Sequence, residues 1–125
     1  DWEWIEAYPS EVYFATRQDF TRDGDVVTMW TRIEYRDPQA QPVPHRSVAS
    51  RDAWDCAGQR RANLNIVYYR WSNLDDGEPQ ASKTMIQSWE GIQPDTLGAT
   101  LLDFACSLQP LQDLVTGPAA AEPAP

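Results

Sequence analysis

The chain has 125 residues, which is the ordinary length of a single domain. Its formal net charge of −9 repels phosphate backbones at long range, so nucleic acid is excluded as an expected partner. No apolar run approaches the roughly 18 residues that a spanning helix requires, and the sequence therefore predicts a globular domain without a transmembrane segment.

The segment at residues 1–10 alternates acidic and apolar side chains until Pro9 breaks the pattern. In an extended arm, Trp2 and Trp4 would lie on one face, because successive side chains of a strand point to opposite sides. These rings are either offered to a partner or packed on the domain as part of an edge segment. We favour the edge segment.

Residues 12–16 and 26–35 have the composition and alternation of strands, and Gly24 supplies a turn between them. In the second segment Val27 lies on an apolar face, while Trp30 lies on the opposite face among polar side chains. One apolar and one mostly polar face is the pattern of an antiparallel sheet.

A loop with three prolines is expected at residues 37–44. Alternation then resumes in a predicted strand at residues 46–56, whose apolar face includes Val48, Trp54 and Cys56.

The next predicted strand, at residues 64–71, has aromatic side chains on both faces, with Tyr69 and Trp71 on the face that should be polar. A turn at residues 73–79 and a weakly alternating last strand at residues 81–89 follow.

A helix is predicted to begin after Pro94, with Asp95 or Thr96 as its N-cap, and to end before Pro110. Its apolar residues fall at helical spacing: Leu97, Leu101, Phe104, Ala105 and Leu108. We therefore expect a single domain at residues 1–109, followed by a Pro/Ala-rich disordered tail at residues 110–125.

The two cysteines, Cys56 and Cys106, admit either one internal disulfide or two free thiols. We expect the disulfide, because Cys56 lies on the apolar strand face that would meet the helix carrying Cys106. Closing a loop of about fifty residues would stabilise the domain by up to about 4 kcal/mol. A disulfide also indicates an oxidising location: the periplasm, the cell surface or the medium.

The predicted fold is α+β: an antiparallel sheet of about five to six strands, with the C-terminal helix packed on one face and a disulfide from strand to helix. No catalytic motif is found, and the only histidine, His45, is expected in a loop without a role. The cysteine and histidine spacing matches no zinc site, and the sequence predicts no metal, no cofactor and no enzyme activity.

Aromatic side chains on a face that should be polar are typical of an interface. The candidate binding residues are therefore Tyr69 and Trp71, joined by Trp30 and by a rim of Arg60, Arg61 and Arg70. Two alternatives stay open. The arginines at 60 and 61 could instead pair with Asp52 or Asp55, and the N-terminal arm could cover the aromatic face.

The ordered combination of several segments resembles the surface-adhesin protein E family of Gram-negative bacteria over about residues 8 to 108. It consists of the Gly24 turn before residues 26–30, Asp55-Cys56 followed by Arg60-Arg61, the Tyr68-Tyr69 pair, Trp89 before Ile92-Gln93-Pro94, and a last helix that ends in Cys106.

The resemblance implies an exported sheet-and-helix domain with a strand-to-helix disulfide, located in the periplasm, on the outer-membrane surface or in the medium. It also implies binding to host extracellular-matrix or serum proteins, although only Lys83 is present for lysine-dependent capture. Self-association, with a homodimer as one form, is a further expectation. The alternative function is a periplasmic structural or scaffolding module.

Overall fold

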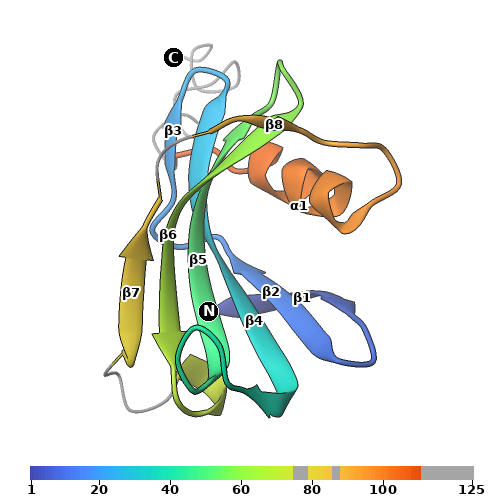
Figure 1. The fold of residues 1–125 in the computed structure, drawn as a ribbon. Helices are drawn as coiled ribbons and strands as arrows, with labels where there is room; N and C mark the ends of the chain where they lie inside the picture. The colour runs from blue at the N-terminus through green and yellow to red at the C-terminus, as the bar shows by residue number, and fades with distance from the viewer. Residues whose placement is uncertain (75–78, 86–87, 111–125) are drawn as a thin grey trace, which may run out of the picture.

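The computed structural model describes residues 1–74, 79–85 and 88–110. In this part of the chain, eight antiparallel strands form one twisted sheet, and a single α-helix crosses one of its faces (Figure 1). The strand order is β1-β2-β4-β5-β6-β7, with β3 paired to β4 and β8 paired to β6. The elements are β1 (Trp2–Ala7), β2 (Glu11–Thr16), β3 (Thr21–Asp23), β4 (Val26–Gln39), β5 (His45–Asp55), β6 (Arg60–Tyr69), η1 (Ser72–Leu74), β7 (Ala81–Thr84), β8 (Glu90–Gly91) and α1 (Leu97–Cys106).

The central pair of strands, β4 and β5, follows the alternation of the sequence. Val27 faces Trp54 across this pair, and both side chains are fully buried on the face that the helix covers. Trp30, on the other face of β4, is only partly buried. The prediction of an antiparallel sheet with one core face is confirmed.

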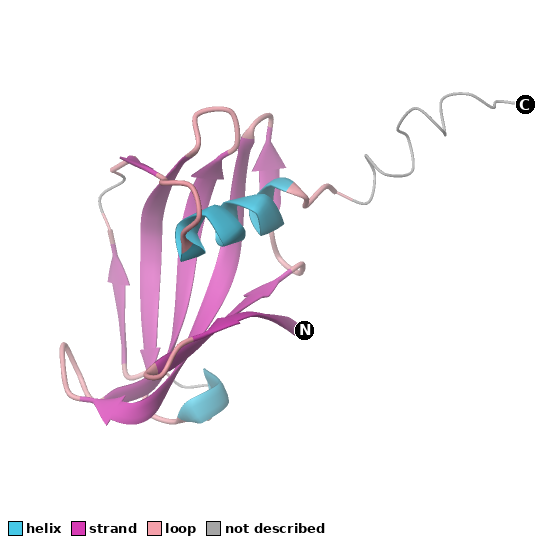
Figure 2. Cartoon of the chain, turned by 90° about the vertical axis from the view of Figure 1, so that its right-hand side faces the viewer, coloured by secondary structure: helices cyan, strands magenta, loops and turns pink. Residues whose placement is uncertain are grey.

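The helix contributes the second layer of the core (Figure 2). Thr96 is its N-cap and accepts a hydrogen bond from the backbone N–H of Ala99 at 3.2 Å, so the second of the two expected caps is the one used. The buried side chains of the helix are Leu101, Leu102 and Ala105. Together with Leu108, just beyond the end of the helix, they pack against Ala15, Val27, Met29 and Trp54 of the sheet. Full burial of a large apolar side chain stabilises the fold by about 1.5–3 kcal/mol.

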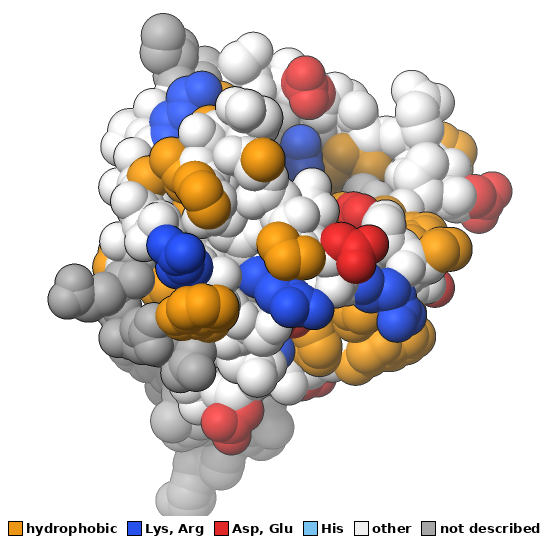
Figure 3. All heavy atoms as spheres, turned by 60° about the horizontal axis from the view of Figure 1, so that its bottom comes forward, with side chains coloured by type: hydrophobic (Ala, Val, Ile, Leu, Met, Phe, Trp, Pro, Cys, Tyr) orange, Lys and Arg blue, Asp and Glu red, His pale blue; other side chains and the backbone are white. Residues whose placement is uncertain are grey.

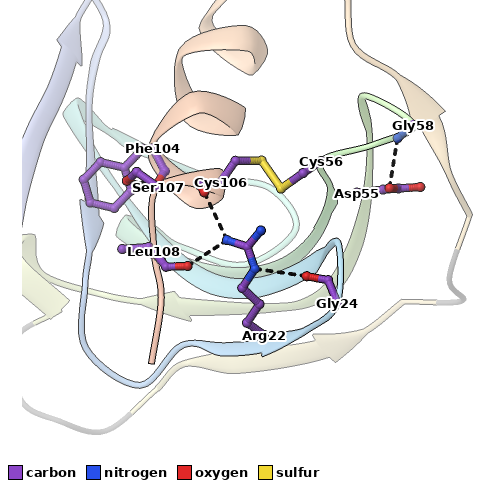
Figure 4. Close-up of a disulfide and its surroundings, with 9 residues drawn as sticks. All are labelled: Arg22, Gly24, Asp55, Cys56, Gly58, Phe104, Cys106, Ser107 and Leu108. Atoms are coloured by element: carbon purple, nitrogen blue, oxygen red, sulfur yellow. Dashed lines mark hydrogen bonds between the residues drawn. A yellow bond between two sulfur atoms is a disulfide. The ribbon is translucent and has the colours of Figure 1, made fainter. Parts of the chain in front are cut away.

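The predicted disulfide is present and joins the end of β5 to the end of α1 (Figure 4). The Cα atoms of Cys56 and Cys106 are 5.9 Å apart, within the usual range for a disulfide. Arg22 of β3 lies beside it and donates hydrogen bonds to the backbone carbonyls of Cys106 and Leu108. The carboxyl end of the helix is thus held to the sheet by a covalent bond and by a guanidinium.

The sheet has more strands than the five to six that we predicted. The N-terminal arm is itself an edge strand, β1, paired with β2 and irregular at Ile5. Two short strands, β3 and β8, were not predicted. The expected strand at residues 81–89 is confined to β7 at Ala81–Thr84, and residues 86–87 lie outside the described part.

Two further corrections concern segments with prolines. β4 continues to Gln39, so the first part of the expected loop at residues 37–44 is strand. His45, expected in that loop, is the first residue of β5 and is 5 % exposed. Its ring packs edge-on against Tyr35 and Tyr68, which explains its burial. The predicted tail lies mostly outside the described residues.

Candidate functional site

The sheet face opposite the helix carries most of the predicted binding residues. We call it the open face and define it by side chains in register across five strands: Trp2 of β1, Phe14 of β2, Trp30 and Arg32 of β4, Ser47 and Ala49 of β5, and Val67 and Tyr69 of β6. It is distinct from the core face, on which Val27, Met29 and Trp54 meet the helix.

A groove of about 310 Å³ lies on the open face, and we call it the aromatic groove. Trp30 and Tyr69, two of the predicted binding residues, line it together with Trp2 from the N-terminal strand and Leu74 from η1. Its other lining residues are Asp1, Thr16, Gln18, Asp19 and Ala49. The structure therefore brings Trp30 and Tyr69 together at one site.

The N-terminal arm contributes to this groove instead of closing it. The guanidinium of Arg32 lies 4.4 Å from the ring centroid of Phe14 and 5.9 Å from that of Trp2, which fixes the arm on the sheet. The prediction of a docked edge segment is confirmed for β1. Trp4, however, leaves 60 % of its surface exposed.

The 3-10 turn η1 is clamped onto the open face by the hydroxyl of Ser47, which is fully buried. The Ser47 hydroxyl donates to the carbonyl of Trp71 at 2.5 Å and accepts from the backbone N–H of Leu74 at 3.0 Å. The side chain of Leu74 is thereby held at the groove.

A second set of polar contacts holds the same turn through Asn73. The Glu34 carboxylate accepts from the backbone N–H of Asn73 at 2.9 Å and from Arg32 Nε at 2.6 Å. Arg32 Nη2 donates in turn to the side-chain carbonyl of Asn73 at 2.7 Å. The cation that supports the aromatic rings of β1 and β2 thus also positions η1.

Three residues around the groove have left-handed backbone conformations. Asp19 and Leu74 line the groove with φ of 59° and 54°, and Asn73 precedes Leu74 with φ of 63°. Asp and Asn tolerate this region, but a bulky residue such as leucine rarely adopts it. Such conformations persist only where the surrounding contacts enforce them, and they concentrate at functional sites.

Trp71 and Arg70 lie beyond the end of β6, outside the aromatic groove. Trp71 is 51 % exposed, and the Arg70 guanidinium lies 5.3 Å from the centroid of one of its rings. Both line a second groove of about 210 Å³, completed by Pro38, Pro44, His45 and Arg46. Figure 3 views the molecule from this end and shows hydrophobic side chains and basic side chains, Lys or Arg, next to one another on the surface.

Arg60 and Arg61 are at the opposite end of β6 from Tyr69, close to the disulfide. The strand has ten residues, so these arginines are roughly 26–30 Å from Tyr69 along it. The structure does not bring the three predicted rim arginines together.

Arg60 makes the ion pair that we had weighed as the alternative to partner binding. Its Nε donates to the Asp55 carboxylate at 2.8 Å, and its guanidinium stacks over the ring of Trp89. The backbone N–H of Gly58, and then Arg60, hold the pKa of Asp55 below its ordinary value. The guanidinium of Arg61 instead lies 5.9 Å from a ring centroid of Trp54.

A buried polar cluster, which our sequence analysis did not single out, lies on the core face of the sheet. Asp52 is 3 % exposed, and its carboxylate accepts from the amide of Asn63 at 2.5 Å and, more weakly, from the hydroxyl of Ser50 at 3.3 Å. Burial raises the pKa of Asp52, although Asn63 and the nearby Arg61 oppose the shift. The alternation that places residue 52 in phase with Trp54 could have revealed this cluster.

In the described residues, no group of three or more His, Cys, Asp or Glu side chains is arranged to hold a metal ion. Nor is any described helix long and apolar enough to cross a membrane. The eight-stranded sheet, the helix across one face and the disulfide between them define a small, disulfide-stabilised α+β domain.

Comparison with known proteins identifies its family. The model of the family described as surface-adhesin protein E matches residues 2–107, and the chain belongs to this family. Among curated protein sequences, none matches the chain.

The fold is also that of solved structures of Haemophilus influenzae protein E. Crystal form II of that protein is 14 % identical and superimposes with a TM-score of 0.64, over 82 % of this chain and 91 % of that one. A structure of protein E from non-typeable Haemophilus influenzae is 17 % identical, with a TM-score of 0.58 over 83 % of this chain and 72 % of that one. The predicted family, fold class and disulfide are confirmed, and the family is one of exported surface proteins.

Proposed function

We propose that this chain is a non-enzymatic adhesin domain that binds a protein partner through the open face. The observation that carries the proposal is the position of Trp30 and Tyr69, which lie partly exposed at one groove on the sheet face that the helix leaves uncovered. Aromatic side chains in such positions are the usual anchors of protein interfaces. Membership of a surface-adhesin family supports the same function.

Trp71 and Arg70 extend this surface beyond the end of β6. An exposed tryptophan with a guanidinium stacked on it offers a large contact area with a polar rim, which is the composition of interface hot spots. The partner that best fits the family is a host extracellular-matrix or serum protein, met at the bacterial surface. A second copy of the chain is the other partner to be tested.

The test compares two double variants of the purified domain for binding to a panel of immobilised matrix and serum proteins. Trp30→Ala with Tyr69→Ala removes the anchors, and we expect binding to fall at least tenfold while the circular dichroism spectrum is unchanged. Arg60→Ala with Arg61→Ala alters the other end of β6 and should leave binding within about twofold. Loss of binding in the arginine variant alone would place the interface at the disulfide end and contradict the proposal.

Light scattering of the same proteins during gel filtration tests the second partner. If a dimer forms and dissociates only in the aromatic variant, then the open face joins two copies of the chain. If the native domain is itself a monomer, the partner is a different molecule.

A further inference from the structure

The aromatic groove has an unusual combination of side chains for a surface on a sheet. Three aromatic residues, Trp2, Trp30 and Tyr69, come from three different strands. Asp19 contributes a carboxylate to the same groove, whereas no Lys or Arg lines it among the described residues; Asp1 lines it too, but its carboxylate lies beside its own α-ammonium group and adds no net charge. Aromatic rings and one uncompensated carboxylate therefore line one space of about 310 Å³.

This combination is selective for a particular chemistry. The face of an aromatic ring carries negative electrostatic potential and attracts a cation placed over it, and several rings around one space form a cage for quaternary ammonium groups. A carboxylate beside such a cage adds Coulomb attraction without requiring a short hydrogen bond. We propose that the aromatic groove binds a quaternary or methylated ammonium group of the choline type.

Other ligand chemistries fit the groove less well. An anionic group would be repelled by Asp19 and would find no lining arginine or lysine as a partner. A purely apolar group would cover the Asp19 carboxylate without replacing the water that hydrates it, which is costly. The net charge of −9 also concentrates cations around the molecule.

The groove is formed before any ligand arrives. Its base includes Ala49 and Thr16, both buried in the sheet, and the hydroxyl of Ser47 holds Leu74 in its left-handed conformation at the rim. Asp19 is fixed in a left-handed conformation as well. A site that needs no rearrangement loses little conformational entropy when it binds.

This inference deepens the proposed function, because the groove lies within the open face, but its test contains no protein partner. Choline is titrated into the domain by calorimetry, and in parallel its neutral carbon isostere, 3,3-dimethylbutan-1-ol. We expect choline to bind at least tenfold more tightly, and this difference to shrink at high salt. Equal affinities for the two compounds, or no binding of choline, would overturn the inference, whether or not protein capture by the open face succeeds.

A matched pair of variants locates the site. Asp19→Asn keeps the shape and tolerates the left-handed backbone, so we expect it to weaken choline binding several-fold without changing the affinity for the isostere. Asp103→Asn removes the same charge from the exposed side of the helix and should leave both affinities unchanged. Equal losses in the two variants would show a general charge effect and overturn the assignment.

Phosphatidylcholine vesicles distinguish a lipid headgroup from a free ammonium compound as the source of the ammonium group. Co-sedimentation of the domain with them, weakened by Asp19→Asn and abolished by excess choline, identifies a lipid headgroup as the ligand. Binding of choline without co-sedimentation identifies a free ammonium compound.

Discussion

The Arg22 guanidinium donates from Nη1 to the backbone carbonyl of Cys106 at 3.0 Å, across 84 residues of sequence. The same nitrogen reaches the carbonyl of Leu108 at 2.9 Å, and Nε donates to the carbonyl of Gly24 at 3.0 Å. The last carbonyls of a helix lack partners within the helix and carry partial negative charge. Arg22 therefore supplies the carboxyl end of α1 with hydrogen bonds that the helix itself does not provide.

Removal of this contact should weaken the attachment of the helix. We expect Arg22→Ala to lower the free energy of unfolding by about 2 kcal/mol, because hydrogen bonds from a charged donor to partly buried carbonyls are lost. Urea denaturation measures the change. Arg36→Ala, at an exposed arginine, is the control and should change stability by less than about 0.5 kcal/mol; an equal effect of both variants would contradict this role for Arg22.

The disulfide should contribute more to the free energy of unfolding than Arg22 does. Replacing both Cys56 and Cys106 by serine is expected to lower the free energy of unfolding by about 2–4 kcal/mol, since the unfolded chain gains the freedom of a 50-residue loop. Thermal unfolding of the variant, compared with the native protein with and without reductant, measures this. Reductant should have no effect on the variant.

Stability should depend on pH through Asp52. Its pKa in the folded protein is raised above that of the unfolded chain, so its favourable contribution is complete at low pH and is lost as the pH rises through the raised pKa. We therefore expect Asp52→Asn to raise the free energy of unfolding at pH 7 by on the order of 1 kcal/mol, because a buried charge is removed.

The advantage of that variant should disappear below about pH 4, where the native carboxyl is protonated in both states. Chemical denaturation of the variant and of the native protein at pH 7 and pH 3.5 measures the difference in their free energies of unfolding at each pH. A variant that is less stable than the native protein at pH 7 would show that the ionised form of Asp52 is needed by its hydrogen-bonding partners.

The clamp on η1 predicts a local effect. In Ser47→Ala the N–H of Leu74 and the carbonyl of Trp71 lose their shared partner, at a cost of about 1–3 kcal/mol. Hydrogen exchange should show lost protection at Leu74, and choline binding should weaken because one side of the groove is released. Ser82→Ala, at an exposed position of β7, serves as the control.

Local patterns predicted the core but not the site as a whole. Alternation placed Val27 and Trp54 on the core face and Trp30 on the opposite face, because strand geometry alone decides which way a side chain points. The prediction that Trp71 shares a face with Tyr69 is wrong, because it extended the strand alternation beyond Tyr69. The strand β6 ends there and the chain turns into η1.

The remaining groove residues come together through contacts that are distant in sequence. Trp2 reaches the groove through the register of β1 on β2, and Leu74 reaches it through the buried hydroxyl of Ser47. The neighbouring prolines predicted a loop at His45, yet its edge-on contacts with the rings of Tyr35 and Tyr68 hold it in a strand. Tertiary packing overrides local preference in each of these cases.

The bond between Cys56 and Cys106 also determines how the molecule would respond to tension. A pulling force applied to the two ends of the chain passes directly from β5 to the end of α1 and bypasses the 50-residue loop between them. At about 3.3–3.6 Å per extended residue, roughly 170 Å of chain cannot be pulled out while the bond is intact. β6, which carries Tyr69, lies inside this protected loop. Tension that unravelled β1 would therefore remove Trp2 from the aromatic groove while Tyr69 stayed on an unextended strand.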